Sequence, residues 1–194
     1  MKKLLLGSSS PRRKEILSYF TYPFTQVSPH FDEKLIPFNG DPASYVTELS
    51  TKKAASLASH YSDTVILTAD TCVYKNGKLY NKPEDDDEAL QMLTELSGSP
   101  HTVYTGVTVQ LGEKTYTDHA ETKILFHDLP REELALYHNA FRSTDKAGGY
   151  GIQQAGSVIV KQIDGCFYNV MGLPISLTCT LLKGVGIDLW YYLA

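Results

Sequence analysis

The fold is best predicted from residues 4 to 13, which read Leu-Leu-Leu-Gly-Ser-Ser-Ser-Pro-Arg-Arg. The three leucines predict a short buried strand that breaks at Gly7, a residue that allows close backbone approach. A helix should follow at once, because Ser10 can cap its amino end and Pro11 suits its first position. We therefore expect a strand, a hydroxyl-rich turn that includes Ser8, and a helix in immediate succession.

This turn is also a candidate anion site. The amino end of a helix offers N–H groups and a positive dipole, and the guanidinium groups of Arg12 and Arg13 match the bidentate geometry of phosphate oxygens. Two cations in a first helical turn oppose the dipole, so their placement is locally unfavourable unless an anion lies among them. We expect a polyphosphate ligand. The alternative is an ordinary capped helix with solvated arginines.

Composition limits the class of protein. The chain has 194 residues, of which 42% are hydrophobic, and this predicts one compact unit with a real core. The apolar stretch after Met1-Lys2-Lys3 is too short for a secretory signal, and no segment has the length of a membrane span. Three widely spaced cysteines without a CxxC pair argue against a disulfide framework or structural zinc, and they fit a reducing cytoplasm. The formal charge of −4 gives little support to nucleic-acid binding.

Hydrophobic periodicity and turn residues predict a mixed α/β fold. Strands are expected at 24–27, 64–68, 102–110, 114–126 and 157–163, and helices at about 42–57, 87–96, 130–141 and 174–183. Asn76-Gly77 is typical of a hairpin turn. The glycine-rich segment 145–153 indicates backbone that is pressed close to something.

Asp70 is the first choice for a catalytic acid or base. It follows the expected buried strand, and open α/β sheets tend to place functional groups at that position. A carboxylate there can hold a divalent metal or take a proton from water. A turn residue that caps the strand end is an equally weighted alternative.

Further charged residues could complete a triphosphate site. Lys53 and Lys82, together with Arg12 and Arg13, would balance most of the charge of a triphosphate. Mg²⁺ bound by one or two carboxylates and by phosphate oxygens would need no dedicated protein cage. The alternative is that the loop at Asp32-Glu33 and both lysines are solvated surface, which is the more usual place for such residues.

Gln153 could hydrogen-bond a base edge, because its amide offers both a donor and an acceptor. Simple loop polarity is the alternative. The six histidines show neither metal-ligand spacing nor a nucleophile partner, so they receive no role.

Several short motifs occur in one order along nearly the whole chain. They are Ser8-Ser9-Ser10-Pro11-Arg12-Arg13, Ala69-Asp70-Thr71, Lys82-Pro83, Leu96-Ser97-Gly98 with His101, Tyr104-Thr105-Gly106, Asp145-Lys146-Ala147-Gly148, Tyr150-Gly151-Ile152-Gln153 and Val170-Met171-Gly172-Leu173-Pro174. Together they resemble the Maf family. The resemblance implies a nucleoside triphosphate pyrophosphatase, with residues 1–194 as a single domain of inosine-triphosphatase-like fold. That fold has an elongated mixed sheet, flanking helices and a central cleft between two lobes.

The resemblance also implies a substrate. The subgroup that acts on dTTP and UTP carries Ser-Pro-Arg-Arg, Ala-Asp-Thr and Tyr-Gly-Ile-Gln, all present here, whereas the 7-methyl-GTP subgroup typically has tryptophan after the proline. Asp70 would then be the catalytic acid or base. The implied specificity residues are Arg12, Thr71 and Gln153, and the implied metal and phosphate environment contains Glu33, Lys53 and Lys82, with Glu33 and Asp70 as metal ligands.

Mg²⁺ or Mn²⁺ is the implied cofactor, and attack of water at the α-phosphorus is the implied chemistry. A homodimer is suggested by the resemblance alone. Two features depart from the family pattern. Gly7 replaces the usual alanine, and residues 49–54 vary the family's motif. The second departure leaves open whether Lys52 or Lys53 faces the site, although register favours Lys53. The rival interpretation is a nucleotide-sensing protein linked to septum formation that does no chemistry.

Overall fold

The computed structural model describes residues 1–194, and these residues form two compact units. Unit 1 consists of Met1–Asp70, Thr105–Ala120 and Gly172–Ala194, and unit 2 of Thr71–Tyr104 and Glu121–Met171. A single domain with a cleft between two lobes stays a prediction.

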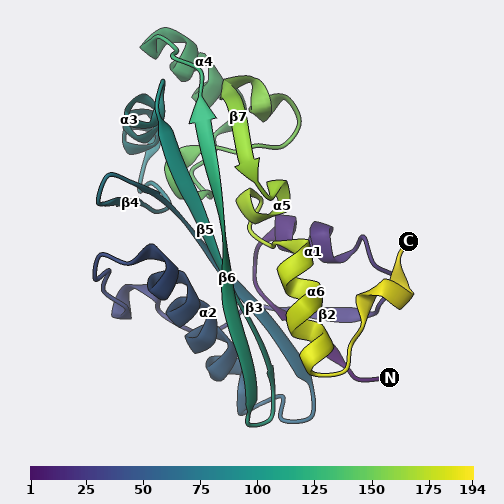
Figure 1. Ribbon diagram of the computed structural model, residues 1–194. Coiled ribbons are helices and arrows are strands. Elements are labelled where there is room, and N and C mark those ends of the chain that lie inside the picture. Colours follow the sequence, from purple (N-terminus) through teal and green to yellow (C-terminus); the bar gives the residue numbers. More distant parts are fainter. The chain divides into compact units, whose positions relative to one another are not determined.

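Seven strands form one sheet in the order β2-β1-β3-β5-β6-β7, with β4 paired to β3 (Figure 1). Their bounds are β1 Leu4–Gly7, β2 Phe24–Val27, β3 Val65–Lys75, β4 Lys78–Tyr80, β5 Pro100–Leu111, β6 Lys114–Phe126 and β7 Val160–Gly165. Strand β1 pairs in parallel with both β2 and β3. Strand β4 pairs antiparallel with β3, and β7 pairs antiparallel with β6. The sheet is therefore mixed, and the predicted mixed α/β class is confirmed.

The α-helices are α1 Pro11–Leu17, α2 Pro42–Ala58, α3 Asp86–Leu96, α4 Arg131–Phe141, α5 Phe167–Val170 and α6 Ile175–Gly184. Four short 3-10 helices accompany them: η1 Glu33–Leu35, η2 Ala147–Gly149, η3 Gln154–Ile159 and η4 Leu189–Tyr192. Ser10 caps α1 as expected, and Asp41 caps α2, with Pro11 and Pro42 in the first turns. No helix combines the length and the apolar character that a bilayer span requires.

In unit 1, helix α2 packs on the parallel strands. Leu5 of β1 and Ile66 of β3 are paired neighbours, and both pack against Ala54 and Leu57 of α2. Gly106 of β5 brings the sheet close to the same helix, because a Cβ built on this glycine would lie 2.3 Å from the backbone oxygen of Val46. The position of α2 is thus set by apolar packing and by one missing side chain.

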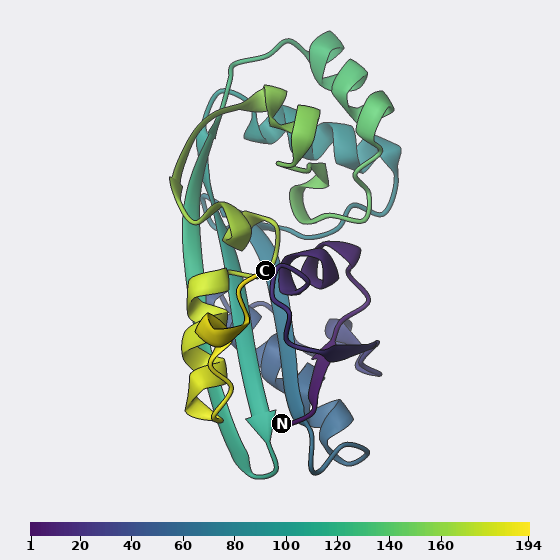
Figure 2. The same cartoon turned by 90° about the vertical axis from the view of Figure 1, so that its right-hand side faces the viewer.

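In unit 2, helices α3 and α4 lie against each other (Figure 2). The glycine-rich segment contacts α3: Gly148 and Gly149 both have positive φ, and a Cβ on Gly149 would lie 3.3 Å from backbone atoms of Ala89. The expectation of close backbone approach is confirmed, and the neighbour of Gly149 is a helix of the same unit.

The structure differs from the expectation in three respects. Strand β3 continues through Asp70 to Lys75, where the sequence suggested a break after residue 68. Residues 157–159 belong to η3, and the last strand runs instead from Val160 to Gly165, where Asp164 pairs with Lys123. The helices η1, α5 and η4 were not predicted, because each spans only three or four residues.

Candidate active site

The site is built on the turn between β1 and α1. Ser10 caps the helix, since its Oγ accepts from the backbone N–H of Arg13 at 3.5 Å. The Ser8 hydroxyl oxygen accepts from the backbone N–H of Ser10 at 3.2 Å and from Nη1 of Arg13 at 3.3 Å. The turn and Arg13 of the helix therefore form one hydrogen-bonded unit.

Arg13 is held from a second side. Its Nε donates to the backbone oxygen of Gly172 at 2.7 Å, across 159 positions of sequence. Burial lowers the pKa of Arg13, and the negative charges of Asp70 and Glu33 act against that shift. The guanidinium of Arg12 lies near enough to lower it further. Positive charge is thus concentrated at this turn, with carboxylates close by.

Lys53 joins the two carboxylates. Its side chain on α2 is buried, with 7% of its surface exposed, and its Nζ lies 2.7 Å from Oε1 of Glu33 and also contacts Oδ1 of Asp70. Lys52 is exposed on the same helix. Lys53 is thus the lysine that contacts the carboxylates, and its role toward a substrate stays a prediction.

The pairing of strands explains why Asp70 reaches Lys53. Strand β1 ends at Gly7, opposite Thr68, so β3 extends two residues beyond it to Asp70. Side chains alternate along a strand, and Ile66, Thr68 and Asp70 therefore share one face. Ile66 packs against α2 and Thr68 Oγ1 donates to the Ser50 carbonyl at 2.7 Å, which places Asp70 on the α2 side as well.

Burial raises the pKa of the Asp70 carboxyl, while the positive charges of Lys53 and Arg13 act against this rise and the charge of Glu33 adds to it. Asp70 is only 7% exposed. A buried carboxyl whose pKa is raised by desolvation and which has charged neighbours is typical of an acid or base in a functional site.

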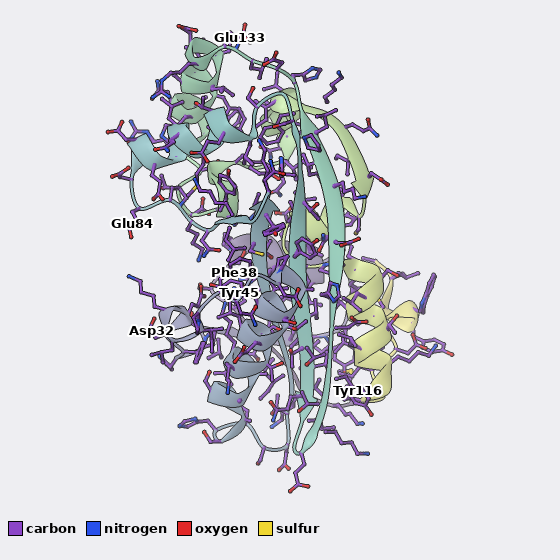
Figure 3. The ribbon with its side chains drawn as sticks, turned by 60° about the vertical axis from the view of Figure 1, so that its left-hand side comes forward. Asp32, Phe38, Tyr45, Glu84, Tyr116 and Glu133 are labelled. Carbon is purple, nitrogen blue, oxygen red and sulfur yellow. The ribbon has the colours of Figure 1, made fainter.

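Glu33 comes from the loop between β2 and α2. Asp32 caps the short helix η1 by accepting from the backbone N–H of Lys34 at 3.0 Å, so this acid has a structural role. Phe38 packs edge-on against Tyr45 of α2, with ring centroids 5.7 Å apart (Figure 3). This contact ties the loop that carries Glu33 to the helix that carries Lys53.

The cluster of Ser8, Arg13, Lys53, Glu33 and Asp70 can perform two kinds of chemistry. Its cations can bind an anion, and its carboxylates can hold a cation or accept a proton. No group of three or more His, Cys, Asp or Glu side chains in residues 1–194 could hold a metal ion. A metal here would have to take the remaining ligands from substrate or water.

The other three predicted site residues belong to unit 2. Thr71 follows Asp70 directly on β3 and is half-buried. Lys82 is exposed after β4, and Gln153 is half-buried at the start of η3. Their roles stay predictions.

Sequence reasoning missed Gln26 on β2. Its side-chain Nε2 donates to the carbonyl oxygen of Ser8 at 2.8 Å and to that of Ser10 at 3.3 Å. The only sequence signal for it is a glutamine within the predicted strand 24–27. The role of the Gly172 carbonyl was missed as well.

Known proteins match this chain over nearly its whole length. A family model described as Maf-like protein matches residues 3–185. A dTTP/UTP pyrophosphatase of Chlamydia caviae is 47% identical over 192 residues, covering 98% of each chain. A protein of the same name from Bacillus cereus is 42% identical, covering 97% of this chain and 98% of the relative. The solved structure of the Staphylococcus aureus Ham1 protein matches with a TM-score of 0.52 at 12% identity, over 95% of this chain and all of that one, which shows a shared fold.

Proposed function

We propose that this chain, which belongs to the Maf family, is a nucleoside triphosphate pyrophosphatase that hydrolyses dTTP and UTP to the monophosphate and pyrophosphate. Relatives named dTTP/UTP pyrophosphatase match it over nearly their full length. The observation that carries the proposal is the convergence of the buried Asp70 with Lys53, next to the fixed Arg13.

The basic residues would bind the triphosphate. Arg13 is anchored through Ser8 and Gly172, so its guanidinium is already oriented before a ligand arrives. Arg12 and Lys53 would add charge, with Lys82 as a further contact. Because the transition state of phosphoryl substitution spreads negative charge over oxygens, cations fixed in advance lower the barrier without later reorganisation.

Asp70 would take the proton of the attacking water at the α-phosphorus, with Glu33 beside it. A raised pKa brings a carboxylate closer to the basicity that proton abstraction near neutral pH requires. The preference for a pyrimidine nucleotide would come from Arg12, Thr71 and Gln153. Gln153 would contribute through an amide that can both donate and accept hydrogen bonds.

The carboxylate pair fits a divalent cation. Glu33 and Asp70 already converge on one positive charge, the Lys53 ammonium, and carboxylate oxygens are the ligands that Mg²⁺ and Mn²⁺ take. When bound, such an ion would supply Lewis-acid stabilisation of phosphate oxygens. Glu33 and Asp70 would hold it.

The test is a panel of nucleoside triphosphates with Mg²⁺ or Mn²⁺, scored by chromatography for the monophosphate and by a coupled assay for pyrophosphate. Preference for dTTP and UTP, with one pyrophosphate per monophosphate, is expected. Release of orthophosphate would contradict cleavage at the α-phosphorus. Binding without turnover would favour the nucleotide-sensing alternative. The proposal extends to a homodimer in the cytoplasm, which sedimentation and cell fractionation would check.

A further inference from the structure

The side-chain amide of Gln26 holds the backbone of the turn that carries Ser8 and Ser10. Gln26 lies on β2 directly opposite Leu6 of β1, two residues before Ser8. Its Nε2 donates to the Ser8 carbonyl at 2.8 Å and to the Ser10 carbonyl at 3.3 Å. Carbonyl oxygens only accept hydrogen bonds, so the amide must present its NH₂ group, and its two hydrogens match the two acceptors.

This amide acts on a residue that is already central to the candidate site. The carbonyl of Ser8 is bound by Gln26, while its hydroxyl oxygen receives Nη1 of Arg13 at 3.3 Å and the N–H of Ser10 at 3.2 Å. Ser8 is thus fixed at its backbone and at its side chain. A chain of contacts runs from Gln26 through Ser8 to the guanidinium of Arg13.

We propose that Gln26 is a positioning residue for triphosphate binding: it fixes the turn from Ser8 to Ser10, and through Ser8 it orients Arg13. The inference rests on the proposed function. Without the amide, the Ser8 carbonyl loses the donor of its 2.8 Å hydrogen bond, and the Ser10 carbonyl keeps only the backbone N–H of Lys14 at 3.3 Å. A turn that must face phosphate oxygens then gains freedom to rotate the Ser8 carbonyl toward the ligand. The loss should therefore appear in binding more than in the chemical step.

Three variants separate the donor from the bulk of the side chain. Gln26→Met keeps the length and removes the NH₂ group. Gln26→Glu keeps the shape and places carboxylate oxygens against the two carbonyls. Gln26→Asn keeps the amide but shortens its reach by one methylene. Thr25→Val is the matched control, because Thr25 lies on the same strand and its side chain is exposed.

The measurements are KM and kcat for dTTP or UTP, the dissociation constant of inorganic tripolyphosphate and the melting temperature. For Gln26→Met we expect KM and the tripolyphosphate constant to rise about tenfold, which corresponds to the loss of one or two ordinary hydrogen bonds. The change in kcat should be much smaller, as for the loss of uniform binding. For Gln26→Glu the affinity should recover as pH falls, because the protonated acid regains one O–H donor.

If Gln26 has a purely structural role, its replacement would lower the melting temperature. The dissociation constant of tripolyphosphate, measured well below that temperature, would then stay unchanged. That result, in whichever of the Met and Asn variants folds, would overturn the inference while leaving the proposed function intact. A wild-type chain that binds no tripolyphosphate and hydrolyses no triphosphate would overturn both. Unchanged constants for Thr25→Val with raised constants for Gln26→Met would support the assignment.

Discussion

Lys53 and Glu33 form an ion pair in which Nζ lies 2.7 Å from Oε1, although one residue comes from the long helix α2 and the other from a single 3-10 turn. The same ammonium contacts Asp70. One buried cation therefore serves two carboxylates, and removing it would leave the buried charge of Asp70 with only the nearby charge of Arg13 to offset it, which is unfavourable inside a protein.

Replacing this lysine should expose a cation site. In Lys53→Met the two carboxylates keep their positions but lose their shared positive charge, so we expect tighter binding of Mn²⁺ in the absence of nucleotide, by about tenfold or more. Electron paramagnetic resonance of free Mn²⁺ would measure the dissociation constant. Hydrolysis of dTTP should fall in the same variant, because the phosphates lose a cation.

Lys52→Met is the control for this experiment, since Lys52 is exposed on the same helix. It should bind Mn²⁺ as the wild type does. Equal Mn²⁺ affinities in the two variants and the wild type would show that Lys53 does not hold the place of a metal ion.

Asp70→Asn should abolish turnover while leaving the fold intact. The amide has nearly the same shape but cannot take a proton from water, and loss of a general base costs about 10²- to 10⁴-fold in rate. Lys53 would still have Glu33 as its partner. Pyrophosphate release and circular dichroism would be measured together, with Asp118→Asn as the control because its side chain is 60% exposed. Near-normal turnover in Asp70→Asn would remove this residue from the mechanism.

The sequence predicted Asp70 as a candidate, and its place on the strand was predicted less well. Local residue types around Ala69-Asp70-Thr71 suggest a strand end, because polar residues follow a run of apolar ones. In the structure β3 continues to Lys75, and the strand that ends is its neighbour β1, at Gly7. A carboxylate can be buried in mid-strand here because Lys53 compensates its charge, and no local pattern of residues encodes that pairing.

Local signals predicted the elements of the site, and long-range contacts completed it. Ser10, Pro11 and Asp41 act within a few residues of themselves, so their capping roles follow from sequence. The anchor of Arg13 on Gly172 joins residues 159 positions apart, and no periodicity encodes it. The amide of Gln26 reaches the turn only because β2 pairs with β1 in this register.

Gly106→Ala should destabilise the chain and weaken substrate binding. A Cβ at this position would lie 2.3 Å from the Val46 oxygen and 2.4 Å from its carbon, and backbone cannot yield as a side chain does. We expect a loss of about 1–3 kcal/mol in the free energy of unfolding, as for other overpacked sites. A raised KM should accompany it, because α2 carries Lys53. Urea unfolding and steady-state kinetics would measure both.

Gly184→Ala is the matched glycine control. Its nearest contacts are ring atoms of Tyr116 at 3.3 Å, which belong to a side chain that can shift. Gly184 ends helix α6, where alanine is compatible with the backbone. An equal loss of stability in both variants would show that the approach of Gly106 to α2 has no special role.

His101 should make unit 2 sensitive to acid. It is buried beside Phe126, and its Nε2 lies 2.9 Å from the hydroxyl of Tyr150. Burial lowers its pKa from 6.5 to about 3, with the charge of Lys75 as a second cause. The folded state therefore binds fewer protons than the unfolded state between these values. The contribution of neutral His101 to the free energy of unfolding is fully present above pH 6.5 and is lost as pH falls toward 3.

Below the pKa of His101 in the unfolded chain, the free energy of unfolding should fall by about 1.4 kcal/mol per pH unit. This amounts to roughly 2 kcal/mol between pH 6.5 and pH 5. Urea unfolding of His101→Gln at several pH values should show this part of the slope removed, whatever the variant does to stability at neutral pH. His60→Gln, which changes an exposed histidine, should keep the wild-type slope. If His101→Gln and the wild type lose stability in parallel as pH falls, another group controls the acid sensitivity, and His101 is not the buried neutral histidine that its packing against Phe126 and Tyr150 indicates.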